Sequence, residues 1–471
     1  MGGFLIVFLH HHLKLNYNSF SISFFYDIME KRKTGGNSSM KKEISFAKDL
    51  MEFLDKSPCA FFAVEEMKAR LQAKGYEELQ EQDAWDLKKN GKYYVTKNNS
   101  AILAFQIGSG EIEKEGFHII GSHSDSPCFR VKHNPEMSVE GKYLKLNTEV
   151  YGGPILSTWF DRALSLAGRV TVKGKDAFHP KSLFVNIQED FMTIPNLCIH
   201  MNRGVNDGTS WNAQKDTLPF LATLEKGMEV EGALQRKIAD LLAVKIEDIL
   251  GMDLFVYDRE KAKIIGMKQE FVQSGRIDNL GMAHASLEAL LTSKKSKACN
   301  VILVSDNEEV GSMTKQGANS PFLKNTLRRI VLSLGKGEEE FMRALANSFL
   351  ISSDQAHALH PNYTEKQDLT NRPVLNGGVA IKIAANQAYT SDAHSIAVFT
   401  GICQKAKQKY QFFHNRSDMK GGSTIGPITT TQLDIPSVDI GNPILSMHSV
   451  RELLGIQDHY SLYQIFQEFY K

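Results

Sequence analysis

A histidine and an aspartate two residues apart close an apolar run in the first third of the chain. His123 and Asp125 follow Phe117–Gly121, which has the composition of a buried strand. An imidazole at the end of a strand is well placed to bind a metal ion. A carboxylate two residues further on can accept a hydrogen bond from the other ring nitrogen and so fix the orientation of the ring. A single His-x-Asp triplet is as often an ordinary polar pair, so a metal site requires further ligands elsewhere in the chain.

Three other segments supply carboxylates in similar settings. Glu308 and Glu309 follow one apolar run and Asp354 follows another, so each comes just after a predicted strand. Asp278 precedes a stretch of helical composition, where an aspartate is also a common helix cap. A solvated acidic turn is the competing explanation for the glutamate pair.

The last candidate ligand is a histidine in a loop before a C-terminal helical stretch. Parallel strands of an α/β sheet end at one edge, so residues far apart in sequence converge there. Two imidazoles and three carboxylates suit two zinc-like cations, because a bridging hydroxide and about three negative charges balance four positive ones. We therefore predict a two-metal centre with the ligands His123, Asp278, Glu309, Asp354 and His448.

The ligand types also suggest how the five residues divide. With a bridging carboxylate from Asp278, one cation takes His123 and Asp354 and the other takes Glu309 and His448. Glu308 is then left as the general base. It would accept a proton from water whose pKa the metals lower to roughly 7, and return that proton to the leaving amine. Such a mechanism needs no serine or cysteine nucleophile.

These residues lie in motifs that resemble the aspartyl aminopeptidase family, and the motifs follow in the family's order. The stretches that carry the resemblance are Gly121–Pro127, Tyr151–Arg162, Arg276–Leu280, Asp306–Ser312, Ser353–Asn362, Gly422–Pro427 and Ser446–Glu452. The resemblance implies a cytosolic, dinuclear zinc exopeptidase that removes N-terminal acidic residues from peptides, Asp in preference to Glu. It places the family's ligands on the same five residues, the catalytic carboxylate on Glu308 and the metal-bridging role on Asp278. Asp125, which the spacing places beside His123, is counted with Glu308 as a candidate catalytic residue.

An acidic substrate residue needs a cation in its pocket, because burying an unpaired carboxylate costs several kcal/mol. Lys382 is the candidate: it lies in the strand-like run 379–384 and resembles the family's acid-recognising lysine. The competing explanation is a lysine that guards an edge strand against aggregation. His357 and His360 could add hydrogen bonds in the same pocket, or could be structural histidines.

The resemblance further implies assembly through an inserted domain, with dimers built into a homo-oligomer that is commonly a dodecamer. In that family a histidine from a neighbouring subunit lies near the active site, and His200 resembles it. The family pattern is broken at Met419 and Lys420, where its members usually carry a shorter polar residue and a proline.

Length and composition indicate a globular protein of more than one domain. The chain has 471 residues, 42% hydrophobic and 23% charged. A net charge of +1, with scattered Lys and Arg, argues against nucleic acid or acidic lipid as a partner. The five cysteines are widely spaced and form no Cys-x-x-Cys pair, which fits a reducing cytoplasm.

The hydrophobic pattern predicts an α/β fold: a three-layer catalytic domain with a mostly parallel sheet, interrupted by a β-rich domain. Helical periodicity over 44–54 and 60–74 is followed by strands, short alternating segments fill the middle of the chain, and the βα alternation then resumes. The predicted parts are a leader or mis-assigned start at 1–40, catalytic segments at 41–126 and 272–471, and the inserted assembly domain at 127–271.

The leader carries the apolar run 4–9 and a triplet of histidines, His10 to His12. The run is too short to span a membrane, and the segment lacks the basic region and cleavage site of a signal peptide. A start at Met29 or Met40 explains it more simply, and no function is assigned to it.

Two other functions fit the same residues. A related dinuclear metallo-aminopeptidase or deacylase would share the metals without Lys382, and a scaffold protein would keep the fold without the chemistry. Retention of every ligand and of Glu308 argues against a scaffold.

Overall fold

The computed structural model describes residues 40–471, and the chain divides into two units, residues 1–46 and 47–471. Of the first unit only residues 40–46 are described, and they begin a helix that ends at residue 56. The sheets and the candidate site all belong to the second unit. The predictions made for residues 1–39 lie outside the described residues.

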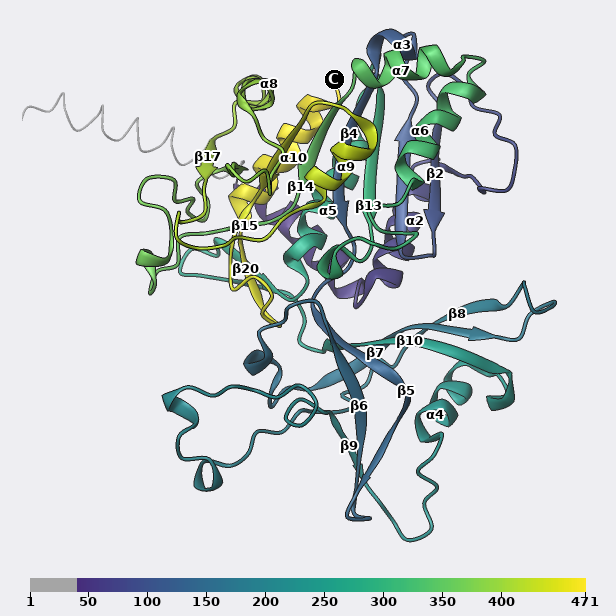
Figure 1. Cartoon of the computed structure of the whole chain (residues 1–471), viewed down its shortest axis with the longest axis vertical. Coiled ribbons are helices and arrows are strands. Elements are labelled where there is room, and N and C mark those ends of the chain that lie inside the picture. Colours follow the sequence, from purple (N-terminus) through teal and green to yellow (C-terminus); the bar gives the residue numbers. More distant parts are fainter. Residues whose placement is uncertain (1–39) are drawn as a thin grey trace, which may run out of the picture. The chain divides into compact units, whose positions relative to one another are not determined.

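A nine-stranded sheet carries the candidate site, with the strand order β1-β2-β3-β13-β4-β14-β18-β16-β17 (Figure 1). Its strands are, in that order, Glu77–Glu78, Lys92–Lys97, Ala101–Gln106, Cys299–Ser305, Phe117–His123, Phe349–Ser353, Ser437–Gly441, Val379–Lys382 and Tyr410–Phe413. The neighbours β13, β4, β14 and β18 are mutually parallel, so their carboxyl ends lie at one edge. This bears out the mostly parallel sheet predicted from the sequence.

Helices cover both faces of this sheet, because alternate side chains of its strands point to opposite sides. Ile120 and Ile302 pack with one set of helices: α2 (Ala60–Ala73), α5 (Ile277–Thr292), α8 (Ala393–Ala406) and α10 (Ile456–Phe469). Ile119 and Val301 pack with the other set: α6 (Phe322–Ser333), α7 (Glu338–Ala346) and α9 (Ile425–Leu433), with the single-turn α3 (Ile112–Glu115). The predicted three-layer α/β architecture is confirmed.

A six-stranded antiparallel sheet is built from the chain between His123 and Asp278. Its order is β8-β7-β10-β5-β6-β9, with the strands Lys181–Asn186, Leu164–Val172, Ile249–Asp258, Cys128–Val139, Tyr143–Tyr151 and Phe220–Thr223. α4 (Ala233–Leu242) packs on its core. The strand-rich character predicted for this segment is present, while its domain boundaries and its role in assembly stay predictions.

A smaller five-stranded sheet completes the fold, with the order β11-β12-β20-β19-β15. Its strands are Lys263–Ile265, Phe271–Ser274, Glu452–Gly455, Pro443–Leu445 and Ala356–His357. The loop between β19 and β20 carries His448, so this sheet sets the position of the last candidate ligand. Within residues 40–471, none of the helices combines the length and apolar composition needed to cross a bilayer.

Candidate metal centre

Four of the predicted site residues lie at the carboxyl ends of neighbouring strands. His123 is the last residue of β4, and Asp354 directly follows β14. Glu308 and Glu309 form a 3-10 turn, η5 (Glu308–Val310), after β13. Because β4 pairs with both β13 and β14, the three strands deliver these side chains to the same place.

Asp278, in the first turn of α5, stands between two imidazoles. Its Oδ1 lies 3.6 Å from Nε2 of His123, and its Oδ2 lies 3.6 Å from Nε2 of His448. Nε2 of His123 is also 3.5 Å from Oδ1 of Asp354, and Nε2 of His448 is 3.4 Å from Oε2 of Glu309. The structure therefore brings all five predicted ligands together, in two groups that share Asp278.

The donor atoms of this cluster are buried and incompletely paired. His123 is 1% exposed and Asp278 is 3% exposed. Among the described residues, Oδ1 of Asp278 and Oε1 of Glu309 have no hydrogen-bond partner. A buried carboxylate oxygen without a partner is costly, and a cation within reach would remove that cost. One ligand atom from each of these three residues lies within 4.8 Å of the others, so the residues fit a metal ion.

Asp125 connects the two halves of the cluster. Its Oδ1 lies 3.3 Å from Nδ1 of His123. It also accepts the backbone N–H groups of Glu308 and Glu309, each at 3.1 Å, and the hydroxyl of Tyr151 donates to its Oδ2 at 2.7 Å. Asp125 thus fixes both a candidate ligand and the turn that carries the glutamates, which is the arrangement expected of a carboxylate behind a metal ligand.

The carboxylates of the cluster have different environments. Burial raises the pKa of Glu308 to about 7, and the charges of Asp354 and Asp125 add to this effect while His123 opposes it. Burial also acts on Asp354, but Lys382 and His123 outweigh it and lower the pKa of that carboxyl. Oε2 of Glu308 lies 3.9 Å from Nε2 of His123, so it borders the cluster rather than joining its ligand pairs.

Lys382 ends β16, which lies between β18 and β17 inside the sheet. It is 3% exposed, its Nζ is 3.4 Å from Oδ2 of Asp354, and it lies 5.4 Å from the ring centroid of Tyr389. The alternative of a lysine guarding an edge strand is therefore wrong: strand order depends on long-range pairing, which the sequence of one strand does not reveal. The structure places the ammonium group of Lys382 beside the candidate ligand Asp354.

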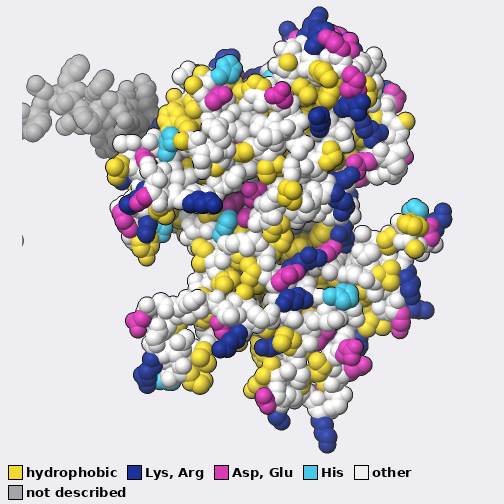
Figure 2. All heavy atoms as spheres, in the orientation of Figure 1, with side chains coloured by type: hydrophobic (Ala, Val, Ile, Leu, Met, Phe, Trp, Pro, Cys, Tyr) yellow, Lys and Arg dark blue, Asp and Glu magenta, His cyan; other side chains and the backbone are white. Residues whose placement is uncertain are grey.

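A cavity of about 230 Å³ opens over the centre, and Lys382, Tyr389 and His357 line it together with the candidate ligands. Figure 2 shows acidic and histidine side chains next to each other in a recess of this face. His357 is surrounded by protein but exposed to the cavity, and burial and then Lys382 lower its pKa. His360 lines a neighbouring cavity instead. His200 is exposed, in the 3-10 turn η2 (Ile199–Met201), and lines neither cavity.

Two positioning groups escaped the sequence reasoning. Glu452 is 2% exposed, and its two oxygens accept the backbone N–H groups of Asp278 and His448, each at 2.9 Å. Gly153, from the loop after β6, uses its carbonyl to accept from Nδ1 of His448 at 3.1 Å. Both residues lie inside motifs singled out above, but a contact with a distant backbone group leaves no mark on spacing or composition.

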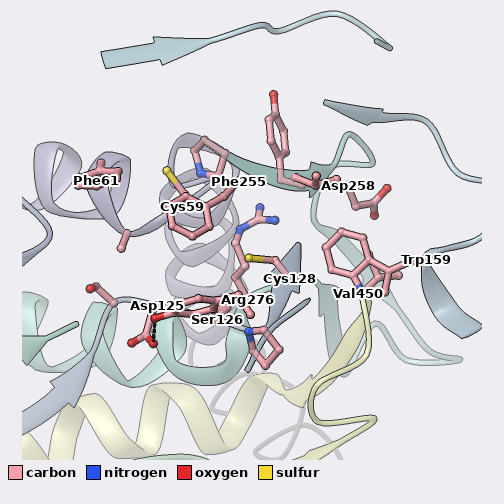
Figure 3. Close-up of a pocket in the computed structure, with 18 of the residues that line it drawn as sticks. Cys59, Phe61, Asp125, Ser126, Cys128, Trp159, Phe255, Asp258, Arg276 and Val450 are labelled. Atoms are coloured by element: carbon pink, nitrogen blue, oxygen red, sulfur yellow. Dashed lines mark hydrogen bonds between the residues drawn. The ribbon is translucent and has the colours of Figure 1, made fainter. Parts of the chain in front are cut away.

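A second cavity, of about 50 Å³, lies on the other side of the Asp125 turn (Figure 3). Cys59, Cys128 and Trp159 line it, and the Arg276 guanidinium reaches into it. Burial raises the pKa of the Cys59 thiol to about 12, so this thiol stays protonated and unreactive near neutral pH. None of the five candidate ligands lines this cavity, although Asp125, which holds His123 and the turn of the glutamates, does.

The fold and the centre at its sheet edge are those of a metallo-aminopeptidase, since the family model described as Aminopeptidase I zinc metalloprotease (M18) matches residues 53–470. The chain belongs to this M18 peptidase family. The match confirms the resemblance seen in the sequence at the level of the family.

Individual relatives agree over nearly the full chain. A probable M18 family aminopeptidase 2 of Clostridium novyi (strain NT) is 56% identical over 431 residues, which is 92% of this chain and 100% of the relative. A protein of the same name from Pseudomonas aeruginosa (strain UCBPP-PA14) is 42% identical, covering 89% and 97% of the two chains.

Solved structures show the same architecture. A chain of the Ape4 and Nbr1 complex is 35% identical, with a TM-score of 0.87 and coverage of 91% of this chain and 86% of that one. A chain of the S. cerevisiae mApe1 dodecamer is 25% identical, with a TM-score of 0.78 and coverage of 90% and 95%.

Proposed function

We propose that this protein is a dinuclear zinc aminopeptidase that removes acidic residues, Asp in preference to Glu, from the N-termini of peptides. The observation that carries the proposal is the position of Asp278 between two imidazoles, each of which has a second carboxylate beside it. Two ligand groups around one shared carboxylate are what a pair of cations requires.

In this proposal the ligands divide as their distances suggest. His123 and Asp354 would hold one ion and Glu309 and His448 the other, and Asp278, which lies between the two imidazoles, would serve both. Mixed nitrogen and oxygen ligands in near-tetrahedral sets suit zinc. When bound, zinc supplies Lewis acidity that polarises a carbonyl group and makes water a stronger acid.

Glu308 performs the proton transfers. Its carboxylate borders the cluster and is not part of either ligand pair, so it is available to accept a proton from the attacking water at Oε2. The same oxygen then delivers this proton to the nitrogen of the leaving amine. Asp125 supports the step by holding the backbone N–H of Glu308 at 3.1 Å.

Lys382 selects an acidic first residue. An ammonium group has three N–H donors, so its contact with Asp354 leaves others for a substrate carboxylate. Tyr389 and His357 line the same cavity and add polar groups near that carboxylate. A neutral first residue would leave the buried ammonium without this partner, which accounts for discrimination against it.

We further propose that the active form is a homo-oligomer, built from dimers into a dodecamer, in the cytoplasm. The relative solved as a dodecamer supports large assemblies in this family. His200 is exposed and does not line the cavity of its own chain, so it is free to serve a neighbouring subunit. The five cysteines are all free, which fits a reducing compartment.

The test combines metal analysis with peptide hydrolysis. Glu308→Gln is expected to keep two zinc ions per chain by plasma mass spectrometry and to lose about 100-fold to 10,000-fold in kcat. Lys382→Ala should lower the ratio of kcat/KM for Asp-peptides over Leu-peptides by about tenfold or more. The matched control is Lys405→Ala, an exposed lysine on α8.

Each variant has an outcome that sinks its part of the proposal. If Glu308→Gln keeps the wild-type kcat, Glu308 is not the general base. An unchanged Asp-to-Leu ratio in Lys382→Ala removes the acid-recognising role, while the zinc content reports separately on the metal centre.

A further inference from the structure

A larger cavity adjoins the one over the candidate centre. Its volume is about 320 Å³, and four of its lining residues also line the first cavity: His357, Phe413, Gly422 and Met447. The two cavities therefore meet. A peptide whose first residue is held at the centre has room to extend its following residues into this neighbouring space.

The lining of this cavity is cationic. It includes Lys366, Arg416 and Lys420 with three histidines, and no aspartate or glutamate. Arg416 is paired with Asp418, at 2.7 Å from Nε to Oδ1, and the charge of Lys366 also acts on that carboxyl, whose pKa both cations lower, Arg416 the more. Lys366 and Lys420 are exposed, and within residues 40–471 neither has a carboxylate oxygen within 4.0 Å of its ammonium group.

Part of the cavity lining is apolar. Ile444, Leu445 and Met447 line it together with the charged residues, as does Met419, which is 46% exposed. Apolar lining beside two ammonium groups, neither held in a close ion pair, suits a side chain with a short aliphatic stem and a carboxylate at its tip. A lysine or arginine in the same place would meet like charges, which is a second source of selectivity.

Lys420 also lies where the sequence departs from the family pattern, next to Met419. The hydrolytic reaction makes no use of either residue.

We propose that this cavity is a subsite for a second acidic side chain of the peptide, on the leaving side of the bond that is cleaved. Lys366 and Lys420 supply the charge that recognises it. The inference rests on the proposed function, because the peptide must first be held by its N-terminal residue at the candidate centre.

The test uses amidated tetrapeptides, so that no C-terminal carboxylate competes. The reference peptide is Asp-Ala-Ala-Ala amide, and Glu or Lys replaces alanine at position two, three or four. For the wild-type enzyme at low salt, kcat/KM should favour Glu over Lys by about three- to tenfold at one position, the size expected of one or two exposed ion pairs. This preference should shrink as salt rises, because screening weakens exposed charges.

Variants assign the preference to the two lysines. Lys366→Ala/Lys420→Ala should bring the Glu-to-Lys ratio close to one, Lys420→Glu should reverse it, and the control Lys405→Ala should leave it unchanged. Equal rates for Glu and Lys at all three positions, or a ratio that survives the double variant, would overturn the inference. Failure of the reference peptide to be hydrolysed at all would instead refute the proposed function.

Discussion

Replacing Glu452 by glutamine should weaken zinc binding without touching a ligand. The two oxygens of this buried carboxylate hold the backbone N–H groups of Asp278 and His448, at 2.9 Å each, and thereby fix two candidate ligands from different elements. Glutamine has nearly the same shape but only one acceptor oxygen. Its NH₂ group must therefore face the backbone N–H of Asp278 or of His448, and two donors cannot form a hydrogen bond with each other.

The magnitude follows from these two hydrogen bonds. Burial and then the charge of Asp278 raise the pKa of Glu452 to about 8, so its hydrogen bonds are counted as neutral ones, at about 0.5–1.5 kcal/mol each. Glu452→Gln keeps one of these bonds, loses the other, and leaves one buried N–H unpaired at a cost of about 1–3 kcal/mol. A displacement of either ligand should lower zinc affinity by about 10- to 100-fold, as changes behind a metal ligand typically do.

Competition with a chromophoric chelator measures this affinity directly. The control is Glu339→Gln, whose side chain is 71% exposed on α7 and lines neither cavity at the centre. Circular dichroism should show that both variants keep the fold. A zinc affinity of Glu452→Gln within twofold of the wild-type value would show that the carboxylate does not position the ligands.

Two further predictions concern the loop after β6 and the acid stability of the fold. Gly152→Ala should lower both the melting temperature and the zinc content, because Gly152 has φ +69° and an added Cβ would lie 3.1 Å from Cβ of Glu309. The control is Gly141→Ala, where φ is +60° and an added Cβ meets open space. It measures the backbone strain alone, which is about 1–2 kcal/mol. Asp49→Asn should destabilise the protein by up to about 1 kcal/mol at pH 7 in urea unfolding. Although burial raises the pKa of Asp49, His284 and a nearby arginine hold it below its usual range, so this stabilisation is present above pH about 4 and is lost as the pH falls.

The strands that carry the site could be predicted because their signal is local. Each of the apolar runs before His123, Glu308 and Asp354 is long enough to form a buried strand and breaks at a polar residue, as β4, β13 and β14 do. Parallel α/β sheets then place their strand ends at one edge, which is why ligands distant in sequence could be expected to meet.

Features that depend on long-range pairing could not be predicted. Lys382 could also have belonged to an edge strand, and only the observed order, with β16 between β18 and β17, places it inside the sheet. The roles of Tyr151 and Glu452 depend on contacts with Asp125 and with distant backbone N–H groups. Neither contact has a period or a spacing that a single sequence displays.

Anomalous diffraction at the zinc edge, from crystals grown with zinc, tests the central claim most directly. The account predicts two peaks on either side of the Asp278 carboxylate, each about 2.0–2.2 Å from its imidazole and carboxylate ligands. A single peak, or peaks at another cluster such as Asp49, His284 and Glu288, would contradict it.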